Sequence, residues 1–166
     1  MNIIINKHFL LYKGYKLKCS FGKLGLSRNK KEGDFTTPKG LFKLGLLYYR
    51  KDRVKLTKCL IKKKIIKKNM GWCDDSKSKK YNQEISFPFK YNAEKFYRKD
   101  NIYDILINIK YNYSPVIKGK GSAIFLHLTN NYKPTAGCIA LKKKDFIVML
   151  NLINKKTNNL FSLVLS

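Results

Sequence analysis

The feature that most constrains the fold is the scarcity of helical periodicity. Only residues 143–154 space their apolar side chains as a helix does, with Phe146, Ile147, Leu150 and Ile153 on one face. Elsewhere the apolar side chains occur in short runs of strand length, at residues 16–21, 41–49, 102–111, 122–128, 137–141 and 160–165. This pattern predicts a mostly β fold, a sandwich or barrel-like domain, with one helix near the end of the chain.

The length of 166 residues is that of one domain, and no linker or repeat divides the sequence. We therefore expect a single domain over residues 1–166. Residues 22–40 and 71–82 are predicted loops, and residues 54–66 fit a strand and a surface meander equally well. No apolar run approaches the ~20 residues of a transmembrane helix, and the apolar run at residues 3–5 is too short for a signal peptide.

The charge balance is strongly basic, with 36 Lys and Arg against 10 Asp and Glu and a formal net charge of +26. Such a charge attracts polyanions in general. Only four of the basic residues are arginines, the side chain that grips guanine edges and phosphates bidentately. The sequence therefore predicts no specific nucleic-acid recognition, and most lysines are interpreted as solvated.

The four cysteines do not form a metal-binding pattern. Cys19, Cys59, Cys73 and Cys138 are widely separated, and only His8 and His127 could add imidazole ligands. Structural zinc sites use closely spaced ligand pairs. We expect no metal and no other cofactor. Cys19, Cys59 and Cys73 are interpreted as packing or incidental thiols, and His8 as a surface residue.

One histidine and one cysteine form a candidate catalytic pair. His127 ends an apolar strand, and Cys138 follows eleven residues later, directly after Gly137. Two adjacent strand ends could bring the two side chains within hydrogen-bond reach, and an imidazole beside a thiol lowers the pKa of that thiol. The amides of Gly137 and Cys138 could face the oxygen of a tetrahedral intermediate. The alternative is a buried structural cysteine with a core histidine.

The sequence resembles the YkuD-type L,D-transpeptidases, in their short single-domain proteobacterial branch. The motifs that carry the resemblance occur in matching order from about Cys19 to Leu165, at residues 31–34, 37–42, 71–75, 81–82, 103–104, 121–127 and 134–141. The resemblance implies the mostly-β catalytic domain of that family, which agrees with the strand pattern. It favours the catalytic interpretation of His127 and Cys138.

The resemblance also implies a reaction. Cys138 would attack the carbonyl of an L-to-D peptide bond in a peptidoglycan stem peptide and form a thioester, which the amine of a second stem peptide resolves. His127 would be the base, oriented by a backbone carbonyl that corresponds here to Leu128. Thr135, Trp72, Asp74 and Asn82 are candidates for the substrate groove. A carbapenem would be a possible covalent inhibitor.

Two departures from the family pattern affect the acceptor side of the site. Ala136 replaces the second histidine of the usual segment, and Ala140 and Leu141 occupy positions that are usually polar. The interval between His127 and Cys138 is also shorter than usual. The nucleophile and the base carry over, but the substrate contacts after the cysteine do not.

Other functions stay open at this stage. The same Cys and His could hydrolyse the bond, as an L,D-carboxypeptidase or endopeptidase, if water reaches the thioester. A basic, non-catalytic protein that binds cell-wall polymer or nucleic acid is a further alternative. A papain-like peptidase fits less well, because there the cysteine precedes the histidine. The implied substrate places the protein in the periplasm or cell envelope, although no signal peptide is visible.

Overall fold

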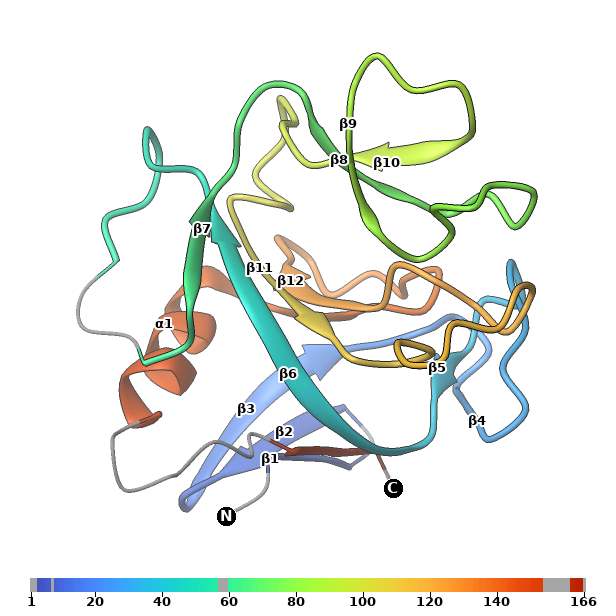
Figure 1. Cartoon of the computed structure of the whole chain (residues 1–166). Helices are drawn as coiled ribbons and strands as arrows, with labels where there is room; N and C mark the ends of the chain where they lie inside the picture. The colour runs from blue at the N-terminus through green and yellow to red at the C-terminus, as the bar shows by residue number, and fades with distance from the viewer. Residues whose placement is uncertain (1–2, 7, 57–59, 154–161, 166) are drawn as a thin grey trace.

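The computed structural model describes residues 3–6, 8–56, 60–153 and 162–165. Within these residues the chain forms fourteen strands and one helix (Figure 1). The elements are β1 Ile3–Asn6, β2 Phe9–Tyr12, β3 Tyr15–Ser20, β4 Leu26–Ser27, β5 Thr37–Pro38, β6 Gly40–Tyr49, β7 Lys63–Ile65, β8 Met70–Cys73, β9 Glu84–Ser86, β10 Ala93–Lys95, β11 Ile105–Ile109, β12 Phe125–Leu128, β13 Ile139–Leu141, α1 Lys143–Leu152 and β14 Ser162–Leu165.

The main sheet closes on itself. Its strand order is β11-β12-β13-β3-β2-β1-β14-β6-β7, and β11 also pairs with β6. The long strand β6 makes this closure possible, since residues 40–43 pair with β14 and residues 44–49 pair with β11. The pairings of β1 with β14 and of β12 with β13 are parallel, and most others are antiparallel. Closure pairs β11 on both sides, and β7 remains as an edge strand beside β6.

A glycine marks the point where β6 passes from one partner to the other. A Cβ at Gly45 would lie 2.0 Å from Asn108 Oδ1, so any side chain there would displace Asn108. The space is occupied by the Asn108 amide, whose oxygen accepts a hydrogen bond from Leu46 N at 2.7 Å. The register between β11 and β6 shifts at the same place, between Ile107 and Ile109. Gly45 and Asn108 together accommodate this irregularity.

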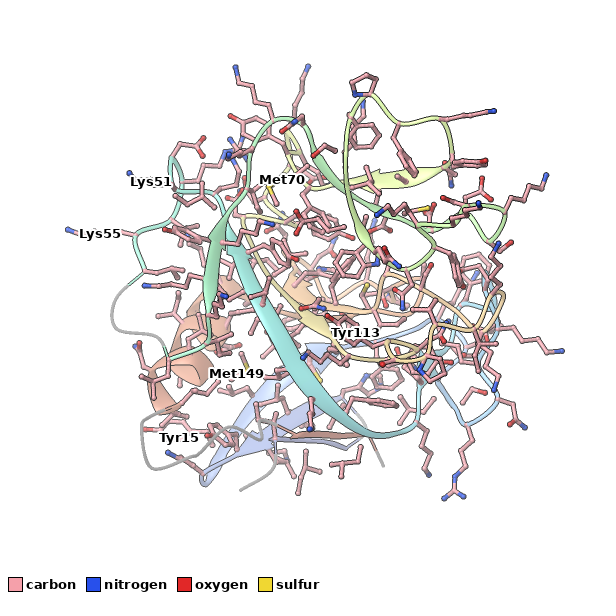
Figure 2. The ribbon with its side chains drawn as sticks, viewed as in Figure 1. Tyr15, Lys51, Lys55, Met70, Tyr113 and Met149 are labelled. Atoms are coloured by element: carbon pink, nitrogen blue, oxygen red, sulfur yellow. The ribbon has the colours of Figure 1, made fainter. Side chains whose placement is uncertain are left out.

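Two separate hydrophobic clusters lie on either side of the β12–β13 pair. The first fills the barrel and includes the buried face of α1, with Phe146, Met149 and Leu150. The second lies between the barrel and a small antiparallel sheet of order β10-β8-β9, and it contains Met70, Trp72, Phe96, Tyr103, Phe125 and Cys138. Figure 2 labels Met149 beside the helix and Met70 beside the small sheet. The second cluster is the one that holds the cysteine of interest.

The predicted fold class is confirmed, because the structure is mostly β with one helix directly after the strand that follows Cys138. Predicted helix 143–154 is observed as Lys143–Leu152, and residue 154 lies outside the described residues. Of predicted strand 160–165, residues 162–165 form β14, and residues 160–161 lie outside the described part. Only β7 forms within residues 54–66, of which 57–59 are not described.

The prediction of a loop over residues 71–82 is wrong at its start. Met70–Cys73 form the buried strand β8 at the centre of the small sheet, and turns follow from residue 76. The physical reason is packing, since the Trp72 ring lies edge-on to Phe125 at 5.4 Å between centroids. The local sequence, a Gly, a Trp and a Cys before two aspartates, has no strand pattern. These residues form a core strand because of their tertiary contacts. No helix of the described residues is long and apolar enough to cross a membrane.

Candidate active site

Cys138 lies directly before β13 and belongs to the second hydrophobic cluster. Its side chain is 9% exposed and lines a pocket of about 150 Å³, which we call the thiol pocket. The residues around this pocket are Lys30, Glu32, Gly33, Phe35, Asp74, Glu94, Ser122, Ala123, Ile124, Ala136, Gly137 and Cys138. The thiol is therefore sheltered from bulk water but reaches a small cavity.

The turn before Cys138 requires glycine. Gly137 has φ of +150°, and a Cβ there would lie 2.8 Å from Thr36 O. Two threonines hold the turn. The Thr37 hydroxyl donates to Gly137 O at 2.7 Å, and Thr135 Oγ1 accepts from Gly137 N at 3.1 Å and donates to Cys138 O at 2.6 Å. The position of the thiol is thus set by side chains from two distant parts of the chain.

The hydrogen bonds of the thiol go to backbone groups of the neighbouring strand. Cys138 Sγ donates to Ala123 O at 3.2 Å and accepts from Phe125 N at 3.4 Å. Burial raises the pKa of Cys138 far above its ordinary value, and the charge of Glu94 raises it further. The expectation of a lowered thiol pKa is therefore wrong for this structure. Because the sulfur lies among aromatic rings, the loss of hydration raises the pKa by more than the charge of Lys30 lowers it.

His127 lies in β12, the strand that pairs in parallel with β13. Its Nδ1 is 2.8 Å from Leu128 O. A carbonyl oxygen can only accept, so Nδ1 carries the hydrogen and Nε2 keeps a free lone pair. Burial lowers the pKa of His127 to about 4, so the imidazole is neutral at neutral pH. The ring also contacts Tyr103 edge-on, at 5.4 Å between centroids.

His127 and Cys138 project from the same face of the β12–β13 pair. His127 is opposite Ala140 in the register, and Cys138 is two residues before Ala140, so the two side chains are diagonal neighbours. Among the described residues no hydrogen bond joins the ring to the thiol. His127 lines a second pocket of about 370 Å³, and Ala136 lines both pockets. The pair therefore rests as two neutral groups on either side of Ala136, not as an ion pair.

Carboxylates gather around the thiol pocket. Glu94 accepts from the Tyr103 hydroxyl at 2.7 Å, and Glu32 accepts from the hydroxyls of Ser122 and Tyr81. Asp74 Oδ1 is buried without a hydrogen-bond partner among the described residues. Burial, and then the neighbouring carboxylates, raise the pKa of both Glu94 and Asp74. Three of the chain's ten acidic residues thus lie at one small pocket.

Among the described residues, the basic side chain that lines this pocket is Lys30, which the sequence did not single out. Its side chain is 3% exposed, and its Nζ forms an ion pair with Asp34 Oδ1 at 2.8 Å. Thr37, Glu94 and Tyr103 were missed in the same way as functional candidates. Thr37 and Tyr103 do belong to motifs that carry the resemblance, whereas Lys30 and Glu94 had no local signal.

The structure separates the four predicted groove residues. Asp74 lines the thiol pocket, and Thr135 lines the His127 pocket. Trp72 and Asn82 line neither of these pockets. Trp72 Nε1 donates to Asn82 Oδ1 at 2.9 Å, and Asn82 Nδ2 donates to the carbonyl of Asn112 at 2.7 Å. These two side chains join β8 to the loop after β11.

The remaining cysteines and the second histidine lie elsewhere. Cys19 is buried in the first cluster, and burial raises its pKa to about 12. Cys73 is buried in β8, and Cys59 lies outside the described residues. His8 is exposed and stacks on Phe21. The described residues hold no group of three or more His, Cys, Asp or Glu side chains that could bind a metal ion.

Comparison with known proteins identifies the family and the fold. The family model of the YkuD L,D-transpeptidase catalytic domain matches residues 3–161. The fold is similar to the crystal structure of the helical cell shape determining protein Pgp2 from Campylobacter jejuni, with a TM-score of 0.53 and 16% identity. That match covers 99% of this chain and 46% of Pgp2, so the chain spans about half of its length. Curated proteins give no significant match. The chain therefore belongs to the YkuD family of L,D-transpeptidase catalytic domains, whose members act on peptidoglycan peptides.

Proposed function

We propose that the protein is an L,D-transpeptidase that cross-links peptidoglycan stem peptides through a thioester on Cys138. The observation that carries the proposal is the placement of His127 and Cys138. Both project from one face of the β12–β13 pair, in the fold of this family, and the thiol follows a glycine turn that two threonines hold. An imidazole with a free Nε2 beside a sheltered thiol is the arrangement that nucleophilic acyl transfer requires.

The resting protonation states favour general-base catalysis over a preformed ion pair. The Cys138 side chain first turns from Ala123 O toward His127. The thiol proton then moves to His127 Nε2 as sulfur attacks the carbonyl of the L-to-D peptide bond. The amides of Cys138 and Gly137 are proposed to stabilise the oxyanion, with Gly137 N leaving Thr135 Oγ1. The proton passes from His127 to the departing amine, and a thioester remains.

The second half of the reaction reverses the proton transfers. The side-chain amine of an acceptor stem peptide attacks the thioester, and His127 accepts a proton from that amine. The new amide bond forms, and the proton returns to the sulfur as Cys138 is released. The shelter of the thiol pocket supports transfer to an amine over transfer to water. The cell envelope is the proposed location, and a carbapenem is the proposed covalent inhibitor.

The test is incubation of the purified protein with muropeptides, followed by mass spectrometry of the products. Cross-linked dimers in the wild type, absent with Cys138→Ala and with His127→Ala, would support the proposal. Shortened monomers without dimers would assign the protein as a hydrolase of the same bonds. Unchanged muropeptides, with binding to the wall retained, would point to a non-catalytic binding protein.

A further inference from the structure

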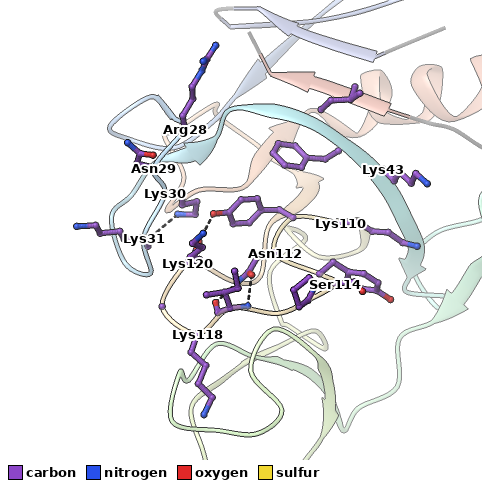
Figure 3. A pocket seen from close by; sticks show the side chains of 17 residues that line it. Arg28, Asn29, Lys30, Lys31, Lys43, Lys110, Asn112, Ser114, Lys118 and Lys120 are labelled. Atoms are coloured by element: carbon purple, nitrogen blue, oxygen red, sulfur yellow. Dashed lines mark hydrogen bonds between the residues drawn. The ribbon is translucent and has the colours of Figure 1, made fainter.

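A larger cavity lies beside the thiol pocket. It has a volume of about 1090 Å³ and is formed by residues 28–31, the first half of β6 and the segment that follows β11 (Figure 3). Its basic side chains are Arg28, Lys30, Lys31, Lys43, Lys110, Lys118 and Lys120, and no Asp or Glu lines it. We call it the basic cavity.

Most of the positive charge of the basic cavity is not balanced by an ion pair among the described residues. Of its seven basic side chains only Lys30 forms an ion pair with a carboxylate among the described residues. Figure 3 shows Lys31, Lys43 and Lys118 spread around the cavity. Charges of one sign that line a concave surface focus the electrostatic field and raise the local concentration of anions.

The wall of the basic cavity is held in place by hydrogen bonds. The Asn112 side chain donates to Ile117 O at 2.8 Å and accepts from Ile117 N at 2.8 Å, which fixes the loop that carries Lys118 and Lys120. The Tyr111 hydroxyl donates to Lys120 O at 2.5 Å, and its ring packs edge-on against Phe42. The cavity thus combines an aromatic floor with a ring of amino groups.

The basic cavity and the thiol pocket are neighbours. Lys30 lines both. Asn112 Nδ2 also donates to Gly121 O at 2.9 Å, one residue before Ser122 of the thiol pocket. The two cavities therefore adjoin at Lys30 and at the segment before Ser122.

We infer that the basic cavity binds the free carboxylates of a peptidoglycan stem peptide while another part of that peptide lies at Cys138. This inference rests on the proposed function. Stem peptides with diaminopimelate carry several carboxylates and an amine. Glu32, Asp74 and Glu94 at the thiol pocket repel carboxylates and attract an ammonium group. The opposite charges of the two cavities therefore give the peptide one preferred direction, with its carboxylates toward the lysines.

The test measures peptide binding separately from turnover. Calorimetry in the Cys138→Ala protein would use the tetrapeptide L-Ala-γ-D-Glu-meso-diaminopimelate-D-Ala and an analogue whose carboxylates are carboxamides. The variant Lys31→Gln/Lys43→Gln/Lys120→Gln removes three charges from the cavity. The control Lys51→Gln/Lys55→Gln/Lys144→Gln removes three exposed charges that do not line it. Figure 2 labels Lys51 and Lys55 at the left of the view, away from the cavity residue Tyr113 near its centre.

We expect the cavity variant to bind the tetrapeptide about tenfold more weakly, since each exposed lysine–carboxylate contact contributes a factor of roughly 1.4 to 5. The control should change Kd by less than about twofold, and the carboxamide analogue should bind alike to both variants. Equal weakening in the two variants would overturn the inference. So would a cavity variant that loses binding to vesicles of anionic phospholipid but keeps its affinity for the tetrapeptide.

The two proposals can fail separately. A wild-type protein that converts muropeptides, with unchanged affinity in the cavity variant, would overturn this inference and keep the proposed function. Cavity-dependent peptide binding without any turnover by the wild type would keep the inference and overturn the proposed function.

Discussion

The thiol pocket and the basic cavity share Lys30 but have opposite charge. The thiol pocket has three carboxylates and one lysine, whereas the basic cavity has seven basic side chains and no acidic one. In a chain with 36 basic and 10 acidic residues, lysines alone say little about a site. The few acidic residues are more informative. Two of the chain's three glutamates lie at the thiol pocket.

The largest expected effect tests whether the chemistry occurs in the thiol pocket. Cys138→Ala should reduce turnover by more than about 10³-fold, since it removes the proposed nucleophile. Cys73→Ala should keep activity, because this thiol is buried in β8 and does not line the thiol pocket. Product formation is measured by mass spectrometry. Full activity of Cys138→Ala would place the reaction elsewhere.

The pH dependence of stability tests the neutral state of His127. Its pKa is about 4 in the folded protein and about 6.5 in the unfolded chain, so the unfolded chain binds the proton first as the pH falls. His127 therefore makes its full contribution to the free energy of unfolding above pH ~6.5. This contribution, about 3 kcal/mol, is lost as the pH falls toward 4. His127→Gln should remove that part of the slope in urea unfolding. His8→Gln should keep it, since His8 is exposed.

The next effect concerns the turn that positions the thiol relative to both cavities. Thr37→Val removes the bond to Gly137 O and the acceptor for Gly22 N, both buried. We expect a loss of about 1–3 kcal/mol in the free energy of unfolding, together with a fall in kcat. Thr37→Ser keeps the hydroxyl and should retain most of both. A Thr37→Val protein with wild-type kcat would show that the turn does not depend on this hydroxyl.

The smallest expected effect compares how a charge in each cavity influences the pKa of Cys138. Glu94→Gln removes a carboxylate that raises the pKa of Cys138, so the thiol pKa should fall. Alkylation of Cys138 at pH 8, followed by mass spectrometry, should then be several-fold faster, because the thiolate is the reactive form. Lys118→Gln, in the basic cavity, should leave the rate within about twofold. Equal alkylation rates in the wild type, Glu94→Gln and Lys118→Gln would show that the Glu94 carboxylate does not affect the pKa of Cys138.

The fold class was predictable from the sequence because it depends on local periodicity. The alternating or continuous apolar runs and the single stretch with 3.6-residue spacing indicate strands and one helix in any context. Closure of the barrel was not predictable. It depends on β6 changing partner at Gly45, where the Asn108 amide takes the space of a side chain. The strand β8 was missed because its aromatic packing comes from residues distant in sequence.

The sequence by itself determined the candidate cysteine–histidine pair, the glycine before Cys138, and the family. Tertiary structure decided the electrostatics. Burial in the aromatic cluster keeps Cys138 and His127 neutral, against the ion pair that their chemistry alone suggests. Lys30 and Glu94 come from segments distant in sequence, line the same pocket as the thiol and change its pKa by their charges. Desolvation and long-range charge depend on which groups surround an atom in three dimensions, and spacing along the chain does not encode that.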